Sequence, residues 1–330
     1  MIVEATPERI NKAARHLLDG GLVAFPTETV YGLGADATSA LAVAAIFDTK
    51  HRPQLNPLIV HGPDLETVAR LGVIEGPALA LAKSFWPGPL TLVVPRRPAA
   101  GVADLTTAGL DTVALRVPAH PVAQALLRAA QVPIAAPSAN VSGAMSPTEA
   151  AHVHDSFAHL PPRQRPWVLD GGRTHVGVES TIVGFRSGKP VVLRPGGIAR
   201  DDLRSVCGPL AAAVASSKVT APGQLARHYA PKTPLRLNAR DVAANEGLLA
   251  FGDRPPTGAA RTLNLSEGGH VREAAANLFA ALRDLDAGGF TAIAVMPIPM
   301  SGIGEAINDR LARAATPEHQ GTLASAPHAL

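Results

Sequence analysis

Short, mostly apolar runs alternate with amphipathic stretches along the first two-thirds of the chain. The runs are typical of buried strands, and the stretches between them have the three-to-four-residue spacing of helices. The predicted strands are LVAF (22–25), LIV (58–60), LTLVV (90–94), VALRV (113–117), PIAA (133–136), STIVGF (180–185) and VVLR (191–194). The predicted helices are 38–48, 63–72, 76–85, 120–130 and 147–154. This alternation predicts one α/β domain over residues 1–207.

The pattern loosens at residues 208–234 and then resumes. Small residues and prolines replace the periodic apolar positions here, so a linker is predicted, although Arg227, His228 and Tyr229 carry more chemistry than a passive spacer needs. Further strands are predicted at LRL (235–237), GLLAF (247–251), TLNL (262–265) and TAIAVM (291–296), with helices at about 271–287 and 303–315. Residues 235–330 are therefore expected to form a second, smaller α/β domain.

Length and composition agree with two domains. A chain of 330 residues exceeds what one compact core usually organises, and its 46% hydrophobic and 17% charged residues are ordinary for a globular protein. The net charge of +3 favours anionic ligands only slightly. No apolar stretch approaches the roughly 18–20 residues that a membrane span needs, and no signal peptide is evident. A cytoplasmic enzyme is expected rather than a membrane protein.

Several common site signatures are missing from the sequence. The single cysteine, Cys207, excludes an internal disulfide framework and cannot build a cysteine metal site alone. A Walker P-loop is absent, because Gly188-Lys189 is followed by Pro190. The segment GLGADA (32–37) is similar to a dinucleotide fingerprint, but polar residues precede it and no acidic residue follows about twenty positions later. Zinc-protease and serine-hydrolase motifs are also absent.

A pair of cations follows the helix predicted at 38–48. In an extended conformation alternate side chains share a face, so Lys50 and Arg52 would both point at one anion, an arrangement that suits a polyphosphate. A solvated basic loop at the C-terminal end of a helix, where cations are favoured anyway, is the alternative. Spacing alone favours this second interpretation.

Small polar groups follow the strand predicted at 133–136. Ser138 and Asn140 would lie at the C-terminal end of that strand, where ligands sit in open α/β sheets. Hydroxyl and amide groups there can bind phosphate oxygens. The same segment could instead be a turn whose side chains bond to their own backbone.

The segment Ser146-Pro147-Thr148-Glu149 has the signature of a helix N-terminus. Serine would be the N-cap, proline the first helical residue and glutamate the end of a capping box. The free backbone N–H groups of such a terminus could also bind an anion.

Two arginines end predicted strands. Arg116 ends VALRV and Arg194 ends VVLR, positions that suggest carboxylate or phosphate ligands. Structural ion pairs are the alternative for each.

Together these segments resemble the threonylcarbamoyl-AMP synthase family. The resemblance rests on PTETVYGLG (26–34), KHR with NPL (50–58), ALRVP (114–118), APSAN with SG (136–143), SPT (146–148), ESTIV (179–183) and LRPG (193–196). They match a YrdC-like catalytic domain over about residues 5–205. RHYAP (227–231) and GIGEAINDRL (302–311) resemble the longer, two-domain Sua-type members. One departure is Ala226, where longer members often have an aromatic residue.

The resemblance implies a nucleotidyltransferase that converts L-threonine, bicarbonate and ATP into L-threonylcarbamoyladenylate and pyrophosphate. It also implies a twisted open mixed sheet with a positively charged cavity, followed by a smaller Rossmann-like domain. The product would feed N6-threonylcarbamoyladenosine formation at tRNA position 37, which a separate downstream tRNA transferase completes. Mg²⁺ would be bound mainly by ATP oxygens and water, and no organic cofactor is expected.

The resemblance also implies roles for individual residues. Lys50 and Arg52 belong to the family's K-x-R motif and are expected to be catalytic, neutralising charge on the phosphates. The ATP contacts that it implies are Arg52, Asn56, Thr112, Ser138, Asn140, Ser146, Arg194 and Tyr229. The threonine contacts are Thr29, His61, Arg116, the backbone at Ala136, and Ser180. The linker 208–234 is expected to close over ATP through Tyr229.

Two other functions remain open at this level. A basic cavity could bind double-stranded RNA or tRNA without catalysis. A carbamoyl transferase that uses carbamoyl phosphate is the second, because YrdC-like domains also occur in hydrogenase maturation factors. Those chains are much larger and contain acylphosphatase and zinc-finger segments that this sequence lacks.

Overall fold

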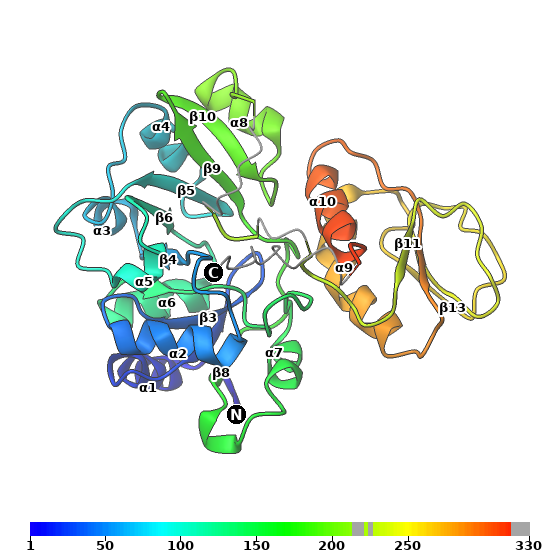
Figure 1. Ribbon diagram of the computed structural model, residues 1–330, viewed down its shortest axis with the longest axis horizontal. Coiled ribbons are helices and arrows are strands. Elements are labelled where there is room, and N and C mark those ends of the chain that lie inside the picture. The colour runs from blue at the N-terminus through cyan, green and yellow to red at the C-terminus, as the bar shows by residue number, and fades with distance from the viewer. Residues whose placement is uncertain (213–220, 224–226, 318–330) are drawn as a thin grey trace, which may run out of the picture.

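The computed structural model describes residues 1–212, 221–223 and 227–317, which form two lobes (Figure 1). The first lobe contains a ten-stranded sheet and the second a four-stranded sheet. Helices α9 (Val271–Asp286) and α10 (Gly304–Ala314) lie on the side of the second lobe that faces the first. The expected fold class, a large mixed α/β sheet followed by a smaller α/β domain, is confirmed.

The large sheet is mixed, with strand order β1-β8-β2-β3-β7-β4-β6-β5-β9-β10. Its strands are β1 Ile2–Glu4, β2 Val23–Pro26, β3 Tyr31–Asp36, β4 Ile59–His61, β5 Leu90–Pro95, β6 Thr112–Arg116, β7 Ile134–Ala135, β8 Trp167–Asp170, β9 Thr181–Arg186 and β10 Lys189–Arg194. Strands β4 and β6 run parallel with His61 opposite Arg116. The C-terminal ends of these two strands therefore present both side chains at one edge of the sheet.

Helices cover the large sheet. They are α1 Pro7–Leu18, α2 Ala40–Lys50, α3 Leu65–Ala69, α4 Gly76–Phe85, α5 Asp104–Thr107, α6 Pro121–Ala130, α7 Ala150–Ser156 and α8 Arg200–Cys207, with a 3-10 turn at Pro162–Gln164. Helix α1 begins after Thr6, whose hydroxyl accepts from the Arg9 N–H, and Pro7 occupies its first turn. Its buried side chains recur every three or four residues and pack in one cluster with those of α6.

The second lobe is a parallel sheet with order β11-β14-β12-β13. Its strands are β11 Leu235–Leu237, β12 Gly247–Ala250, β13 Arg261–Asn264 and β14 Ile293–Val295. The apolar face of α9 supplies Leu278, Phe279 and Leu282 to the core between this sheet and α10.

The core of the second lobe continues into the first. Val30, Met145 and Val178 from the first lobe belong to the same buried cluster as Phe279 of α9. Gly177 approaches α9 so closely that a Cβ there would lie 2.2 Å from the carbonyl oxygen of Ala275. Because only glycine permits this approach, the two lobes have a packed interface and not merely a tether.

Strand β3 was not predicted, and its two glycines explain why. The sequence YGLGAD lacks the side chains that mark a strand, yet every residue except Asp36 is buried. A Cβ at Gly34 would lie 2.7 Å from the Phe25 ring and 2.8 Å from the side chain of Ile134. Packing against the neighbouring strands therefore requires glycine where strand propensity disfavours it. The pattern also left out β1, β8, α1, α5 and α8.

The predicted capping box at Ser146 is wrong. Helix α7 begins at Ala150, and its N-cap Glu149 makes no side-chain capping bond. The Ser146 hydroxyl is buried and donates to the carboxylate of Glu179, while the carbonyl of Pro147 accepts from the N–H of Tyr31. The local sequence predicted that the Ser146 hydroxyl would cap a helix, but this hydroxyl instead bonds to Glu179, a buried carboxylate from a distant segment.

Candidate active site

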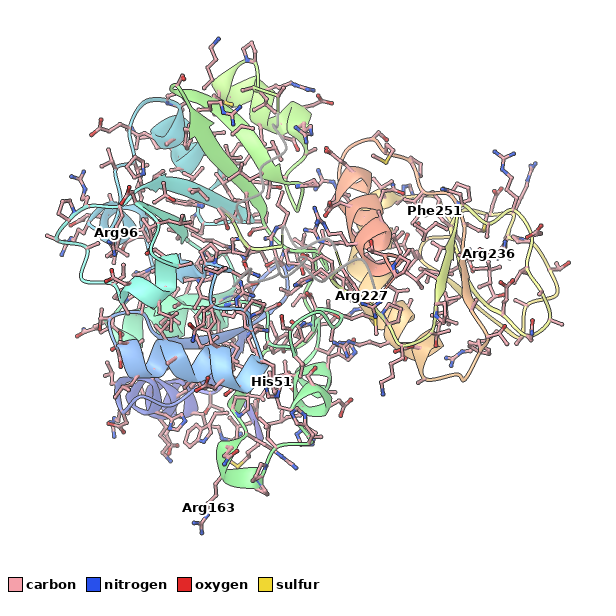
Figure 2. The ribbon with its side chains drawn as sticks, viewed as in Figure 1. His51, Arg96, Arg163, Arg227, Arg236 and Phe251 are labelled. Atoms are coloured by element: carbon pink, nitrogen blue, oxygen red, sulfur yellow. The ribbon has the colours of Figure 1, made fainter. Side chains whose placement is uncertain are left out.

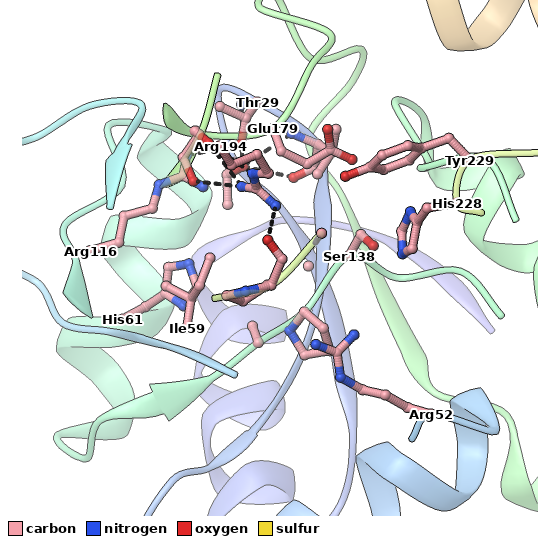
Figure 3. Close-up of a pocket in the computed structure, with 18 residues that line it drawn as sticks. Thr29, Arg52, Ile59, His61, Arg116, Ser138, Glu179, Arg194, His228 and Tyr229 are labelled. Carbon is pink, nitrogen blue, oxygen red and sulfur yellow. Dashed lines mark hydrogen bonds between the residues drawn. The ribbon is translucent and has the colours of Figure 1, made fainter. Parts of the chain in front are cut away.

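A polar cavity lies where β4 and β6 end, and His228 and Tyr229 line it on another side (Figure 3). Its walls carry both charged and neutral polar side chains, and they come from the large sheet and from residues between the lobes. The lining residues are Thr27, Thr29, Val30, Gly32, Arg52, Ile59, His61, Arg116, Ala136, Pro137, Ser138, Glu179, Ser180, Arg194, Pro222, Gly223, His228 and Tyr229. Nine of the residues expected from the sequence are among them: Thr29, Arg52, His61, Arg116, Ala136, Ser138, Ser180, Arg194 and Tyr229.

Arg116 is buried at one end of the cavity with part of its guanidinium unpaired. One terminal nitrogen donates to Glu28 Oε1 at 2.6 Å and to Thr29 Oγ1 at 2.9 Å. The other Glu28 oxygen accepts from the Ala119 N–H at 2.9 Å. Burial alone would raise the pKa of Glu28, but the charge of Arg116 outweighs it and holds that pKa below its usual value. The Nε of Arg116 is buried without a partner among the described residues, so a donor is left for a ligand.

His61 lies beside Arg116 as an uncharged group. Burial, reinforced by the nearby Arg116 charge, lowers the pKa of His61 to about 3. Its Nδ1 lies 3.4 Å from the carbonyl oxygen of Ile134, and the Phe25 ring packs edge-on against it. This end of the cavity therefore combines the buried Arg116–Glu28 ion pair with neutral polar groups.

Arg194 connects the upper wall of the cavity to the linker. Its guanidinium donates to the Ser180 carbonyl at 2.8 Å and to the Ser180 hydroxyl at 3.2 Å, as the dashed lines of Figure 3 show. A second nitrogen lies 3.4 Å from the carbonyl of Pro222. The Ser180 hydroxyl also contacts the hydroxyl of Thr91 at 2.8 Å. One side chain thus links the end of β10, the segment before β9 and the linker.

Lys50 and Arg52 do not share a face. His51 ends α2 in the left-handed conformation with φ of 50°, so the extended backbone expected at residues 50–52 is wrong. Figure 2 shows His51 at this helix end, where it is exposed. The turn at His51 sends Lys50 behind the cavity wall and leaves Arg52 on it.

Lys50 holds the segment that follows β7 in place by hydrogen bonds to its backbone at Ser138 and Asn140. The side chain is 1% exposed, and its Nζ donates to the carbonyl of Ser138 at 2.6 Å and to the carbonyl of Asn140. Burial, with a further contribution from the Arg52 charge, holds the pKa of Lys50 well below its usual value. Its contacts are those of a group that shapes the Ser138 wall from behind.

Arg52 is the cation of this motif that reaches the cavity. It donates to the carbonyls of Asn56 at 3.2 Å and Pro57 at 2.9 Å, which fix the guanidinium near Ser138 and His228. Burial lowers the pKa of Arg52 to about 10, so the group stays charged at neutral pH.

The other expected contacts lie off the cavity wall. The Asn140 amide nitrogen donates to the carbonyls of Val141 and Ala144 in its own turn, both at 2.8 Å, whereas its side-chain oxygen is buried without a partner among the described residues. Asn56 is buried, and neither its side-chain oxygen nor its nitrogen has a partner among the described residues. Thr112 begins β6, four residues before Arg116 and on the same face, which places it about 13 Å away along the strand. Ser146 reaches the cavity only through Glu179.

Glu179 and Arg310 form a buried ion pair that sequence reasoning did not find. Glu179 lines the cavity, and its Oε2 accepts from Arg310 Nε at 2.7 Å. Burial alone would raise the pKa of Glu179, but Arg310 and then Arg194 lower it to about 2. Both residues stand in segments that carried the family resemblance, but nothing in the sequence indicated that positions 131 residues apart are paired.

The linker contributes His228 and Tyr229 to the cavity. Burial lowers the pKa of His228 to about 3, and its Nδ1 has no partner among the described residues. The two rings are 4.0 Å apart, and Tyr229 also packs against Phe279 of α9. Figure 2 shows the neighbouring Arg227 at the junction of the lobes. Ala226, where longer family members often have an aromatic residue, lies outside the described residues.

The described part of the chain contains neither a membrane-spanning helix nor a cluster of metal-binding side chains. No helix there is long and apolar enough to cross a membrane. No group of three or more His, Cys, Asp or Glu side chains that could hold a metal ion was found in residues 1–212, 221–223 and 227–317.

Both lobes match known protein families. A family described as telomere recombination matches residues 15–196, and one described as threonylcarbamoyl-AMP synthase, C-terminal domain, matches residues 198–316. The threonylcarbamoyl-AMP synthase of Pyrococcus abyssi is 41% identical, over 93% of this chain and 94% of that protein. The Bacillus subtilis protein of the same name is 39% identical, over 93% of each chain.

A solved structure extends this likeness to the fold. The crystal structure of P. abyssi Sua5 complexed with L-threonine superposes with a TM-score of 0.86 at 37% identity. The superposition covers 96% of this chain and 97% of that one, so it includes both lobes.

Proposed function

The chain belongs to the threonylcarbamoyl-AMP synthase family, and we infer that its cavity carries out the reaction named by that family. L-Threonine, bicarbonate and ATP are converted into threonylcarbamoyl-AMP and pyrophosphate. One observation carries the assignment to this cavity. An unpaired donor of the buried Arg116 lies at one end, and Arg52 and Arg194 lie on the walls. This arrangement suits a ligand pair with a carboxylate and a polyphosphate.

We propose that threonine binds at the Arg116 end. Its carboxylate would accept from the unpaired Nε of Arg116, while Thr29 and Ser180 offer hydroxyls to its remaining polar groups. His61 stays neutral, so it adds no second charge that would compete for the carboxylate. The amine, once carboxylated to the carbamate, would then face the centre of the cavity.

We propose that the triphosphate lies between Arg52 and Arg194. Condensation of the threonine amine with bicarbonate gives a carbamate and water. A carbamate oxygen then attacks the α-phosphorus, the bond from that phosphorus to the bridging oxygen breaks, and pyrophosphate leaves with the electron pair. The arginines would stabilise the charge that develops on the phosphate oxygens. Positioning and electrostatics supply most of the catalysis in reactions of this kind.

Residues that lie behind the cavity wall would affect the reaction by positioning the residues that line the cavity. Lys50 holds the Ser138 carbonyl, so we assign it the placement of the Ser138 segment rather than direct contact with phosphate. Asn56 carries two buried, unpaired polar atoms beside the Arg52 loop, which makes it a candidate for contact with bound ATP. Thr112 would meet only a ligand that extends along the face of β6, as the nucleoside part of ATP could.

The donor set of the cavity fits Mg²⁺ that arrives with ATP. Its charged wall is mostly arginine, and the carboxylate that lines it, Glu179, is already paired with Arg310. Mg²⁺ would therefore be held by phosphate oxygens and water, and it would supply charge neutralisation at the phosphates.

The linker would exclude water from the labile carbamate. Two observations support this lid role: His228 and Tyr229 line the cavity, and Pro222 contacts Arg194. Beyond this cavity, we propose that the product passes to a separate transferase that completes N6-threonylcarbamoyladenosine at tRNA position 37. A cytoplasmic setting, and direct contact with tRNA or other double-stranded RNA, also remain proposals.

Omission of single substrates tests this function. Pyrophosphate release from ATP is measured in three mixtures: the complete one, one without threonine and one without bicarbonate. Release that needs both substrates supports the proposal. Release that ignores threonine would contradict it, and salt-sensitive RNA binding without threonine-dependent turnover would favour a binding module instead.

A further inference from the structure

Arg310 is an arginine of the second lobe buried against the catalytic cavity of the first. It lies on α10 and is 1% exposed. Its Nε donates to Glu179 at 2.7 Å, one terminal nitrogen donates to the Pro195 carbonyl at 2.9 Å, and the other contacts Asp309. Its contacts in the first lobe are therefore made at the cavity wall and at the turn that follows β10.

Arg310 also lies over the ring of Tyr229. The guanidinium carbon is 5.0 Å from the ring centre, within the range of a cation–π contact. Tyr229 is 1% exposed and lines the cavity. A single guanidinium thus contacts both a wall carboxylate and a lid ring.

The carboxylate of Glu179 poses a problem for an anionic ligand. Glu179 lines the cavity in which the triphosphate is proposed to bind, and a negative charge there would repel it. Arg310 supplies the compensating positive charge without being one of the residues that line the cavity. Removing it would leave a buried carboxylate that keeps the Ser146 hydrogen bond but has no ion-pair partner beside the phosphates.

We propose that Arg310 is a positioning residue of the ATP subsite, which neutralises Glu179 and holds the Tyr229 ring over the cavity. This inference rests on the proposed function. The second lobe then has a specific role, because Arg310 of α10 contributes to the nucleotide side of the cavity through Glu179. The Arg116 end is built by first-lobe residues, since Arg116 bonds to Glu28 and Thr29. Loss of Arg310 should therefore weaken ATP binding and spare threonine binding.

A second ion pair between the lobes provides a matched control. Arg200 of α8 donates to Glu305 of α10, with both contacts at 2.8 Å. This pair is partly exposed, and neither residue lines the cavity. Arg200→Met removes an ion pair that joins α8 of the first lobe to α10, the helix that carries Arg310. It leaves the contacts of Glu179 and Tyr229 with Arg310 in place.

The test compares Arg310→Met, Arg310→Lys, Arg200→Met and the double variant Arg310→Met/Glu179→Gln in the full chain. ATP affinity is measured by calorimetry, and KM is measured for ATP and for threonine. We expect Arg310→Met to weaken ATP binding by about tenfold or more with KM for threonine changed less than about twofold. Arg310→Lys and the double variant should recover most of the loss, and Arg200→Met should behave as the wild type.

Three results would overturn the inference. They are unchanged ATP affinity in Arg310→Met, an equal loss in Arg200→Met, and no recovery when Glu179 is also neutralised. If Arg310→Met does not fold, Arg310→Lys and the double variant give the same comparison. ATP affinity needs no turnover, so a wild-type chain that binds ATP but makes no threonine adduct would contradict the proposed function and leave this inference to be judged separately.

Discussion

The guanidinium of Arg116 and the carboxylate of Glu28 are 2.6 Å apart, and both side chains are at most 5% exposed. Glu28 is itself anchored by the Ala119 N–H, so the pair holds Arg116 in place before any substrate arrives. The pair also leaves Arg116 Nε without a partner among the described residues. Glu28 therefore orients the group that we assign to the threonine carboxylate.

Glu28→Gln should raise KM for threonine while KM for ATP changes little. Glutamine keeps the shape but loses the charge that orients Arg116, and bonds to charged groups are roughly twice as strong as neutral ones. We expect a rise of about five- to thirtyfold in KM for threonine. Glu66→Gln, in an exposed helical pair with Arg70, is the control. Equal changes in both KM values would contradict the role of Glu28.

Lys50→Met should lower both stability and turnover. Methionine fills the space but leaves the carbonyls of Ser138 and Asn140 without their donor, at a cost of about 1–3 kcal/mol. The displaced Ser138 segment should then slow product formation. Thermal unfolding and steady-state rates measure the two effects, with the exposed Lys83→Met as control. A variant as stable and active as the wild type would contradict the role of Lys50 in positioning the Ser138 segment.

Stability should fall as the pH drops below about 6.5. The pKa of His61 and of His228 is lowered to about 3 in the folded state, so between these values only the unfolded chain takes up their protons. Each group then destabilises the fold by up to about 2 kcal/mol at pH 5 relative to pH 7.5. Urea unfolding at the two pH values measures this loss. His228→Asn should reduce it, whereas the exposed His159→Asn should not; an equal pH dependence in both variants would contradict the assignment.

Tyr229→Phe should reduce kcat/KM for ATP with little change in stability. The ring packs against Phe279 and Arg310, so Tyr229→Ala would disturb the lobe interface as well as the lid. Phenylalanine keeps that packing and removes only the hydroxyl. Steady-state kinetics and thermal unfolding of both variants separate the two contributions. Unchanged kinetics in the alanine variant would rule out a lid role for this side chain.

Sequence reasoning succeeded where local pattern decides the structure. The alternation of apolar and polar residues predicted the two α/β lobes, and Arg116 and Arg194 do end β6 and β10. It was wrong where tertiary contacts override local preference. Ser146 gives its hydroxyl to Glu179 instead of a helix N-terminus, and the left-handed turn at His51 separates two cations that an extended strand would align.

The remaining features depend on contacts that no local window contains. Gly34 of β3 is required by Phe25 and Ile134 on neighbouring strands. The pairing of Glu179 with Arg310 joins two lobes, and Lys50 was assigned to phosphate because its burial behind the wall is not visible in a motif.

If one cavity joins threonine, bicarbonate and ATP, atoms from all three must be found in a single product. The full chain is incubated with Mg-ATP, threonine and ¹³C-bicarbonate, quenched rapidly, and analysed by mass spectrometry alongside pyrophosphate. We expect threonylcarbamoyl-AMP carrying one ¹³C, formed in equal amount with pyrophosphate. ADP and phosphate as the products, or AMP and pyrophosphate without a labelled threonine adduct, would contradict it.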